Sequence, residues 1–347
     1  MSIAEAPTSE SVPPPALRFL RSLSGPVIGL AVVLALFIAL IGTDPSPGKL
    51  AKFLSIDNLQ IIAHEATIPA IVALGMLLVI ISGGIDLSVG SVVALVTVVT
   101  MRVYVEFYHT SGARTASALA VASGVGVGGL CGLINGFVVT GLRLPPFVAT
   151  LGMFSVARGL AILLAHRKLL AFPVDTRPAW VDDLARVHVW PWVFNPGFWS
   201  AVVLSLVVAV LLRRTVFGRY VYAVGSNEAT ARLCGVPVKR VKLWVYTLAG
   251  LLAGWAGIIA FAHGSSGNPT GNEGLELEVI AAVVIGGASL TGGRGTVLGT
   301  ILGVLILGVL SNGVNTYNVP VEAQYILIGV IIVANTALSQ WNSRSER

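Results

Sequence analysis

The stretch "LVIISGGIDLSVGSVVALV" (residues 78–96) carries two glycines and an aspartate in the middle of a long apolar run. A charge within such a run is costly if it faces lipid. Gly83 and Gly84 are able to end one helix. Asp86 or Ser88 is then able to accept hydrogen bonds from the free N–H groups that open the next helix. The stretch predicts a turn between two membrane spans, with Asp86 at the positive end of a helix dipole. The alternative is a direct role of Asp86 in gating or solute contact.

The composition excludes an ordinary soluble protein. Of the 347 residues, 55% are hydrophobic and only 11% are charged, whereas a soluble domain carries about 25% charged residues. The mean hydropathy is +0.86. The net charge is +6, without the basic and aromatic stripe of a nucleic-acid-binding surface. Cys131 and Cys234 fit no paired framework, so we expect free thiols. The sequence predicts an all-α polytopic membrane protein.

Apolar runs of membrane length predict a single transmembrane domain with short ends. We expect a disordered N-terminus over residues 1–24, a transmembrane domain over residues 25–340 and a tail over residues 341–347. Several runs are short for a bilayer core that needs about 20 residues, so nine or eleven spans are alternatives. The ten expected spans are residues 26–42, 60–81, 87–105, 116–139, 147–165, 198–212, 242–262, 276–290, 296–311 and 322–339.

The distribution of Lys and Arg predicts the orientation. The segment 213–242 holds seven basic residues, and cytoplasmic loops carry the excess of Lys and Arg. We therefore expect this segment and both termini on the cytoplasmic side of the membrane. The loop 166–197 is then on the outer side.

Two glycine stripes predict close helix packing. Residues four apart share one helix face, and small residues let neighbouring backbones approach. Packing without a transport role is the expected function of both stripes. The first consists of Gly124, Gly128, Gly132 and Gly136, and the second of Gly295, Gly299 and Gly303.

A second stretch has the same pattern as the opening one. "VIGGASLTGGRG" (residues 284–295) also places a Gly-Gly pair before a capping residue. Aligning Gly83 with Gly286 gives a spacing of 203 residues and places Ser289 opposite Asp86. We interpret this as a weak internal repeat whose two copies point the same way; chance similarity between glycine-rich turns is the alternative. Arg294 lies in the second copy, and together with Asp86 and Ser88 it is a candidate for a cytoplasmic gate.

Four motifs resemble the permease subunits of bacterial ABC sugar importers of the ribose/xylose/galactose type. They are "VALGMLLVIISGGIDLSVGSVVAL", "GLINGFVVTGLRLPPFVATLGMFSVARGLA", "YAVGSNEATARLCGVPVKRVK" and "LELEVIAAVVIGGASLTGGRGTVLG". The resemblance covers most of residues 60–335. This sequence departs from the family pattern in its long polar N-terminus and in the loop 166–197.

The resemblance implies a fold like that of the vitamin B12-type importer permease, with about ten helices per subunit. It also implies a homodimer or a pair with a close homologue, a separate ATP-binding subunit and a periplasmic sugar-binding protein. The expected activity is import of a monosaccharide by alternating access.

The polar segment "GRYVYAVGSNEATARLCGVPVKRVK" (residues 218–242) predicts a short helix, capped by Ser226 or Asn227 and ended by Gly235. The resemblance implies that this helix couples the permease to the ATP-binding subunit. A surface helix whose basic residues meet only anionic lipid is the alternative. The expected contacts with the partner are Asn227, Glu228, Ala231, Arg232 and Gly235.

Candidates for the translocation pathway are the charges expected within the spans. Glu65 and Arg158 lie at similar depths, about 9–10 Å from the outer surface at a helical rise of about 1.5 Å per residue. Such charges face a cavity or each other, so an ion pair and a solute path remain open. Asn135 is expected to bond across helices or to a passing hydroxyl. Glu276 and Glu278 are expected near the outer start of the eighth span.

Other classes of protein fit poorly. The string at 64–67, "HEAT", begins like a zinc-protease motif but has Ile at position 68. There is no G-x-S-x-G, so we expect no enzyme. The chain also lacks a P-loop, so ATP and magnesium belong to a partner and no cofactor or metal is expected here. An ion-coupled transporter, and an ABC permease for a furanose signal or a branched-chain amino acid, remain as alternatives.

Overall fold

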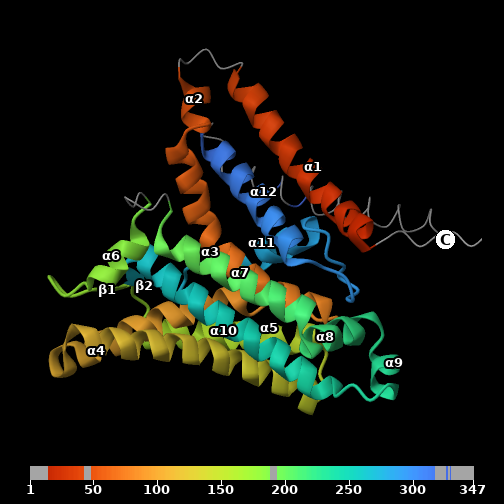
Figure 1. Ribbon diagram of the computed structural model, residues 1–347. Helices are drawn as coiled ribbons and strands as arrows, with labels where there is room; N and C mark the ends of the chain where they lie inside the picture. The colour runs from red at the N-terminus through yellow and green to blue at the C-terminus, as the bar shows by residue number, and fades with distance from the viewer. Residues whose placement is uncertain (1–14, 43–47, 188–193, 317–325, 327–328, 330–347) are drawn as a thin grey trace, which may run out of the picture.

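The computed structural model describes residues 15–42, 48–187, 194–316, 326 and 329 as a helical bundle with one two-stranded ribbon (Figure 1). The helices are α1 (Pro15–Gly42), α2 (Lys49–Phe53), α3 (Ile56–Ile81), α4 (Val89–Gly141), α5 (Pro146–Leu164), α6 (Ala179–Ala185), α7 (Pro196–Arg214), α8 (Val216–Ser226), α9 (Glu228–Leu233), α10 (Val238–Gly264), α11 (Leu275–Ile285) and α12 (Val297–Thr316). The strands β1 (Leu170–Ala171) and β2 (Ser266–Gly267) pair antiparallel. In Figure 1 the ribbon and α6 lie at one end of the bundle and α9 lies at the other; these are called the ribbon end and the α9 end.

Six of the described helices are long and apolar enough to cross a membrane: α3, α4, α5, α7, α10 and α12. α4 contains 53 residues and includes two expected spans, 87–105 and 116–139. It breaks at Gly112, whose backbone is not helical (φ 74°, ψ 163°). The expected span at 322–339 lies almost wholly outside the described residues. The total of ten spans therefore stays a prediction.

Two expected boundaries need correction. α1 begins at Pro15, so residues 15–24 are helical where we expected disorder; residues 1–14 lie outside the described part of the chain. α11 has only 11 residues, too few to cross a bilayer core of about 30 Å. The expected span at 276–290 is therefore a short helix, because Gly286 ends it at the C-cap.

The first glycine stripe is the contact between α4 and α10. A Cβ at Gly128 would overlap the backbone of Gly254, and a Cβ at Gly132 would overlap the Tyr246 carbonyl. In the second stripe, Gly299 and Gly303 of α12 face the carbonyls of Gly286 and Ala282, whereas Gly295 lies before α12 and faces Leu77 and Ile81 of α3. Close backbone packing is therefore confirmed at Gly128, Gly132, Gly299 and Gly303, where the absent side chain is what lets the two backbones meet.

α3 forms the centre of the bundle. Every residue from Ile71 to Ser82 is buried, and Asn58 near its start pairs with Asn312 of α12. Each amide of that pair donates to the other at 3.0 Å. A helix that is apolar on all sides is surrounded by protein or by lipid, and over residues 71–82 it is surrounded by protein. Movement of α3 is therefore coupled to its neighbours.

The turns after α3 and α11 share one set of backbone hydrogen bonds, in a register one residue away from the expected one. The turn after α9 has the same set, so the internal repeat itself stays a prediction. After α3, the N–H groups of Ser82, Gly83 and Gly84 bond to the carbonyls of residues 78, 80 and 79. After α11, residues 286, 287 and 288 make the same three bonds to residues 282, 284 and 283. The left-handed glycines are Gly83 (φ 81°) and Gly287 (φ 88°). The spacing is thus 204 residues, since the position that needs positive φ, and not the first glycine of the pair, fixes the register.

Candidate functional site

Three segments that are distant in sequence meet at the α9 end, where α8 ends. The N–H of Gly293 donates to the Ile81 carbonyl at 2.9 Å. A Cβ at Gly225 would overlap that same carbonyl oxygen and the Gly293 nitrogen. The Tyr222 hydroxyl donates to the Gly295 carbonyl at 2.8 Å. We call this contact of residues 81–83, 222–226 and 292–295 the junction.

The junction brings together the turn that follows α3 and the turn that precedes α12. Gly292 (φ 89°) lies against Gly83, which is the left-handed residue after α3. Arg294, one of the expected gate residues, is exposed beside the junction, and its backbone carbonyl accepts from the N–H of Ser289 at 3.1 Å. Sequence reasoning did not identify Gly225 or Tyr222 as junction residues, because nothing local in the sequence shows which backbones touch.

The short helix α9 follows directly from the junction. The Asn227 side chain accepts from the N–H of Thr230 at 2.9 Å, as expected of an N-cap. Gly235 has φ 82° and closes the C-terminus by donating to the Arg232 carbonyl. Helix position and boundaries therefore agree with the sequence prediction, and Asn227, not Ser226, is the capping residue.

Two cations hold Glu228 at the start of α9. Its carboxylate accepts from Lys242 Nζ at 2.6 Å and from Arg232 Nη2 at 2.8 Å. Lys242 belongs to α10 and is largely buried (16% exposed), whereas Arg232 is exposed. The Lys242 hydrogen bond is the main cause that lowers the pKa of Glu228 below its ordinary value. The carboxylate thus ties α9 to the first turns of α10.

The ion pairs of Glu228 lead us to expect that α9 loosens at low pH. Because the pKa of folded Glu228 is lowered, the pair stabilises the structure above the ordinary carboxyl pKa and is lost as the pH falls through the lowered value. A spin label on the exposed Cys234 should gain mobility as the pH falls from about 7 to about 3, across the carboxyl range. Glu228→Gln should be mobile throughout. A label with the same pH profile in both proteins would contradict the role of the pair.

The exposed apolar side chain of α9 is Leu233 and not Ala231. Ala231 was expected to contact a partner, but it is buried (5% exposed) and packs in the core. Leu233, which was not singled out, is 89% exposed at the end of the helix. Two residues further along a helix turns the side chain by about 200°, which moves it from the core to the surface. On this six-residue helix, Leu233 and not Ala231 is thus the apolar side chain that is free to contact another protein.

The opening turn places Asp86 inside the bundle. Asp86 is 3% exposed, and its Oδ1 accepts from the backbone N–H and the hydroxyl of Ser88, at 2.8 and 2.6 Å. Asn135 donates to the Ser88 hydroxyl at 3.0 Å, so it does bond across the bundle. The Thr150 hydroxyl of α5 bonds to the backbone of the same turn. Asp86 therefore holds the turn before α4 through Ser88, the N-cap residue. No side-chain cap is seen on α4 itself, where either Asp86 or Ser88 was expected to supply one.

The buried turn gives a prediction about Asp86. Asp86→Ala should lower the free energy of unfolding by about 1–3 kcal/mol, because the Ser88 N–H loses its acceptor without gaining water. Asp86→Asn keeps a carbonyl acceptor and should cost less. Thermal unfolding of the detergent-solubilised protein measures both. Equal stability of the Ala and Asn variants would exclude this role of Asp86 as the acceptor that holds the turn.

Arg158 and Glu65 are not paired. Arg158 Nη1 donates to the carbonyls of Pro269 and Gly271, at 2.9 and 3.1 Å. Glu65 is exposed on α3 and its electrostatic neighbour is Glu278. The ion-pair interpretation is therefore wrong: the backbone after β2 supplies carbonyl acceptors that sequence spacing does not reveal.

The segment 266–274 returns into the bundle before α11 begins. The N–H of Asn268 donates to the Thr97 hydroxyl at 3.0 Å. Further along, a Cβ at Gly90, in the first turn of α4, would overlap the Glu276 carboxylate. Glu276 is 9% exposed, and its Oε2 has no hydrogen-bond partner among the described residues. Its expected place near the outer start of a full span is thus wrong, because α11 starts beside the beginning of α4.

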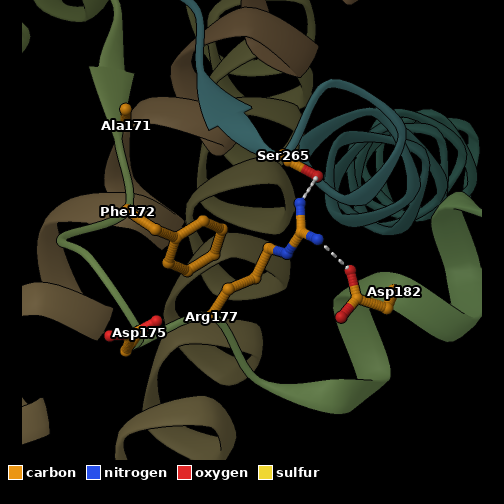
Figure 2. A pocket seen from close by; sticks show the side chains of 6 residues that line it. All are labelled: Ala171, Phe172, Asp175, Arg177, Asp182 and Ser265. Atoms are coloured by element: carbon orange, nitrogen blue, oxygen red, sulfur yellow. Dashed lines mark hydrogen bonds and ion pairs between the residues drawn. The ribbon is translucent and has the colours of Figure 1, made fainter.

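An open cavity of about 630 Å³ lies at the ribbon end. Figure 2 shows the Arg177 guanidinium between Asp182 and Ser265, with the Phe172 ring alongside and Asp175 pointing away. Arg177 pairs with Asp182 at 2.6 Å and donates to the Ser265 hydroxyl at 3.4 Å. Residues 166–187 of the expected loop are therefore structured, and Arg177 fastens them to the C-terminus of α10.

The same loop is joined to the re-entering segment. Leu170 pairs with Gly267 across the ribbon, and Trp180 Nε1 donates to the Ser117 hydroxyl of α4 at 3.0 Å. A displacement of the loop would therefore reach β2 and the carbonyls that hold Arg158.

These features define a polytopic helical membrane protein with a short helix fixed outside its spans. The chain belongs to the family described as the permease component of branched-chain amino acid transport systems, whose pattern matches residues 58–336.

Its relatives confirm the expected resemblance to ABC import permeases. The chain is 38% identical to the ribose import permease protein RbsC of Escherichia coli (strain K12) over 307 residues, which are 87% of this chain and 90% of the relative. It is 35% identical to the fructose import permease protein FrcC of Rhizobium meliloti over 318 residues, 91% and 84% of the two chains. It is also 35% identical to the L-arabinose ABC transporter permease protein AraH of Azospirillum brasilense over 316 residues, 91% and 88%. No solved structure matches the chain at a significant level.

Proposed function

We propose that this chain is the transmembrane subunit of an ATP-driven, binding-protein-dependent importer that moves a monosaccharide by alternating access. The names of the relatives support the solute class, since they are import permeases for ribose, fructose and arabinose. The structural observation that supports the mechanism is the junction. It joins the end of α8, which leads into α9, to the end of the central helix α3 by direct backbone contact.

α9 is the proposed seat of the ATP-binding subunit. Leu233 would enter a groove of that partner, with Glu228 and Arg232 beside it. Because Asn227 and Gly235 fix both ends of the helix, a displacement of α9 is passed to α8 without loss in a flexible loop. From Gly225 it reaches Ile81 and the turn that holds Asp86. ATP binding at the partner would thereby shift α3 relative to α4.

The α9 end is proposed to face the cytoplasm of a bacterial inner membrane, with both termini on that side. The ribbon end would face the periplasm and receive the sugar-binding protein beside Arg177 and Asp175. A vitamin B12-type fold with about ten helices per subunit, and pairing with a second permease copy or a close homologue, belong to the same proposal. ATP and magnesium would be held by the partner subunit, with no cofactor in this chain.

The translocation pathway is proposed to follow the acidic side of α3 and α11. Glu65 is exposed within a membrane-spanning helix, and Glu278 is near it. Carboxylates at membrane depth face a water-filled cavity or another protein. Arg158 would position the segment 266–274 along this path, and Asn135 would support the turn at its inner end.

Transport in proteoliposomes tests this function. The chain, its ATP-binding subunit and its binding protein are reconstituted, and uptake of labelled ribose, fructose, arabinose and leucine is measured. Leucine is included because the family is described by branched-chain amino acid transport. We expect ATP-dependent sugar uptake that a proton ionophore does not reduce. Uptake that needs an ion gradient and continues without ATP would contradict the proposal, and uptake of leucine alone would correct the solute class.

A further inference from the structure

A second cavity, of about 360 Å³, opens at the α9 end, between the end of α4, the turn to α5 and the start of α10. Four cations and one carboxylate line it: Arg143, Arg232, Lys239, Lys242 and Glu228. Glu228 already binds Arg232 and Lys242. Arg143 and Lys239 are exposed and make no ion pair within the described part of the chain. The cavity therefore holds uncompensated positive charge.

The positive cavity continues into an apolar surface. Leu144 lines the cavity itself, and the adjoining side chains of Leu142, Phe147 and Val148 are 61%, 52% and 52% exposed. Phe147 and Val148 belong to the first turn of α5, one of the helices long enough to cross a membrane. Exposed apolar side chains on such a helix contact lipid. The charged cavity thus lies where the hydrocarbon surface of the protein begins.

The backbone fixes Arg143 at this boundary. Arg143 has a left-handed conformation (φ 58°), which a non-glycine residue adopts only where the surrounding structure imposes it. Pro145 caps α5 and Pro146 begins it, so the turn between α4 and α5 is short and stiff. Lys239 projects from the first turn of α10 into the same cavity. Both cations are therefore held at the cavity mouth without a protein anion.

We propose that this cavity binds the phosphate headgroup of an anionic phospholipid, whose acyl chains lie along Leu142, Phe147 and Val148. Phosphate oxygens accept charge-assisted hydrogen bonds from guanidinium and ammonium groups. Basic pockets between membrane helices on the cytoplasmic side have the charge that such headgroups require. The adjoining apolar surface favours a lipid over a soluble anion, and over a carboxylate of the ATP-binding subunit. The proposal does not depend on the transported solute.

Native mass spectrometry of the purified chain in a non-ionic detergent tests the site. Phosphatidylglycerol is titrated against phosphatidylcholine for the wild type and for the double variant Arg143→Gln, Lys239→Gln. Each basic residue near an anionic membrane surface contributes to lipid binding, so we expect the pair to weaken phosphatidylglycerol binding by about tenfold or more. Phosphatidylcholine binding should not change. The control Arg114→Gln, Lys168→Gln removes two exposed cations away from the cavity and should bind both lipids as the wild type does.

Circular dichroism and a monodisperse elution profile show that each variant is folded. Equal phosphatidylglycerol binding by wild type and cavity variant would overturn the proposal, as would equal weakening by the control pair. If the cavity variant keeps its lipid but loses the ATP-binding subunit on purification, the cavity is a protein-docking site. If the wild type fails in sugar uptake but still binds phosphatidylglycerol through these two residues, the proposed function is contradicted and the lipid site is supported.

Discussion

Replacing Gly225 with alanine is expected to abolish both stable expression and transport. A Cβ at this position would overlap the carbonyl oxygen of Ile81 and the nitrogen of Gly293, which are backbone atoms held by their own hydrogen bond. Neither atom is able to move without displacing α3 or the turn before α12. Overpacking in cores costs about 1–3 kcal/mol, occasionally more, and we expect the upper end here. Thermal unfolding in detergent and ATP-dependent uptake measure the effect.

Gly126→Ala provides the matched control. Gly126 also lies within a helix, but nothing is within 4 Å of its Cβ position. Alanine is favoured over glycine in a helix by roughly 0.5–1 kcal/mol, so this variant should be as stable as the wild type or slightly more stable. A Gly225→Ala protein that folds, unfolds and transports like Gly126→Ala would show that the junction is not the tight contact described here.

Replacing Leu233 with aspartate is expected to remove the ATP-binding subunit without unfolding the chain. Leu233 is 89% exposed, so the isolated protein loses no core contact. In the proposed complex the side chain is buried in a partner groove, where an unpaired carboxylate is strongly unfavourable. Alanine at a hot-spot position of an interface costs about 2 kcal/mol or more, and aspartate should cost more. Pull-down of the subunit and its stimulated ATP hydrolysis should both fall by at least about tenfold.

Val174→Asp is the control for Leu233→Asp. Val174 is 88% exposed and lies in the loop before α6, at the ribbon end. The same charge is thus added at the same exposure, away from α9. We expect normal pull-down for this variant. If both aspartates weaken the complex equally, or if neither does, Leu233 is not a coupling contact.

Features set by neighbouring residues could be predicted from the sequence. The turn at residues 82–88, the helix at residues 228–233 and its cap Asn227 follow from glycines and capping side chains a few positions apart. The two glycine stripes follow from the four-residue spacing that places them on one helix face. In each case the physical cause lies within one or two helical turns.

Features set by distant residues could not be predicted in this way. Arg158 pairs with carbonyls more than 100 residues away, on a segment that only the fold places beside α5. The sequence does not show how short α11 is, because its apolar run continues past Gly286. The helix ends where the Gly286 backbone meets Gly299, a contact that only the fold reveals. The burial of Ala231 and the exposure of Leu233 depend on how α9 is rotated about its axis, which its six residues do not encode. The acidic side of Glu65 and Glu278 likewise depends on how α3 meets α11.

The measurement that tests the central claim most directly is the recovery of partners from the native host. The tagged chain is purified in several mild detergents, and the proteins that accompany it are identified by mass spectrometry. Wild type is compared with the charge-swapped variant Glu228→Arg, Arg232→Glu, which breaks the contact with Lys242. We predict a P-loop ATPase with the wild type and much less of it with the variant. Absence of any such ATPase from the wild type in every detergent would contradict an ATP-driven importer, and equal recovery from both proteins would contradict coupling through α9.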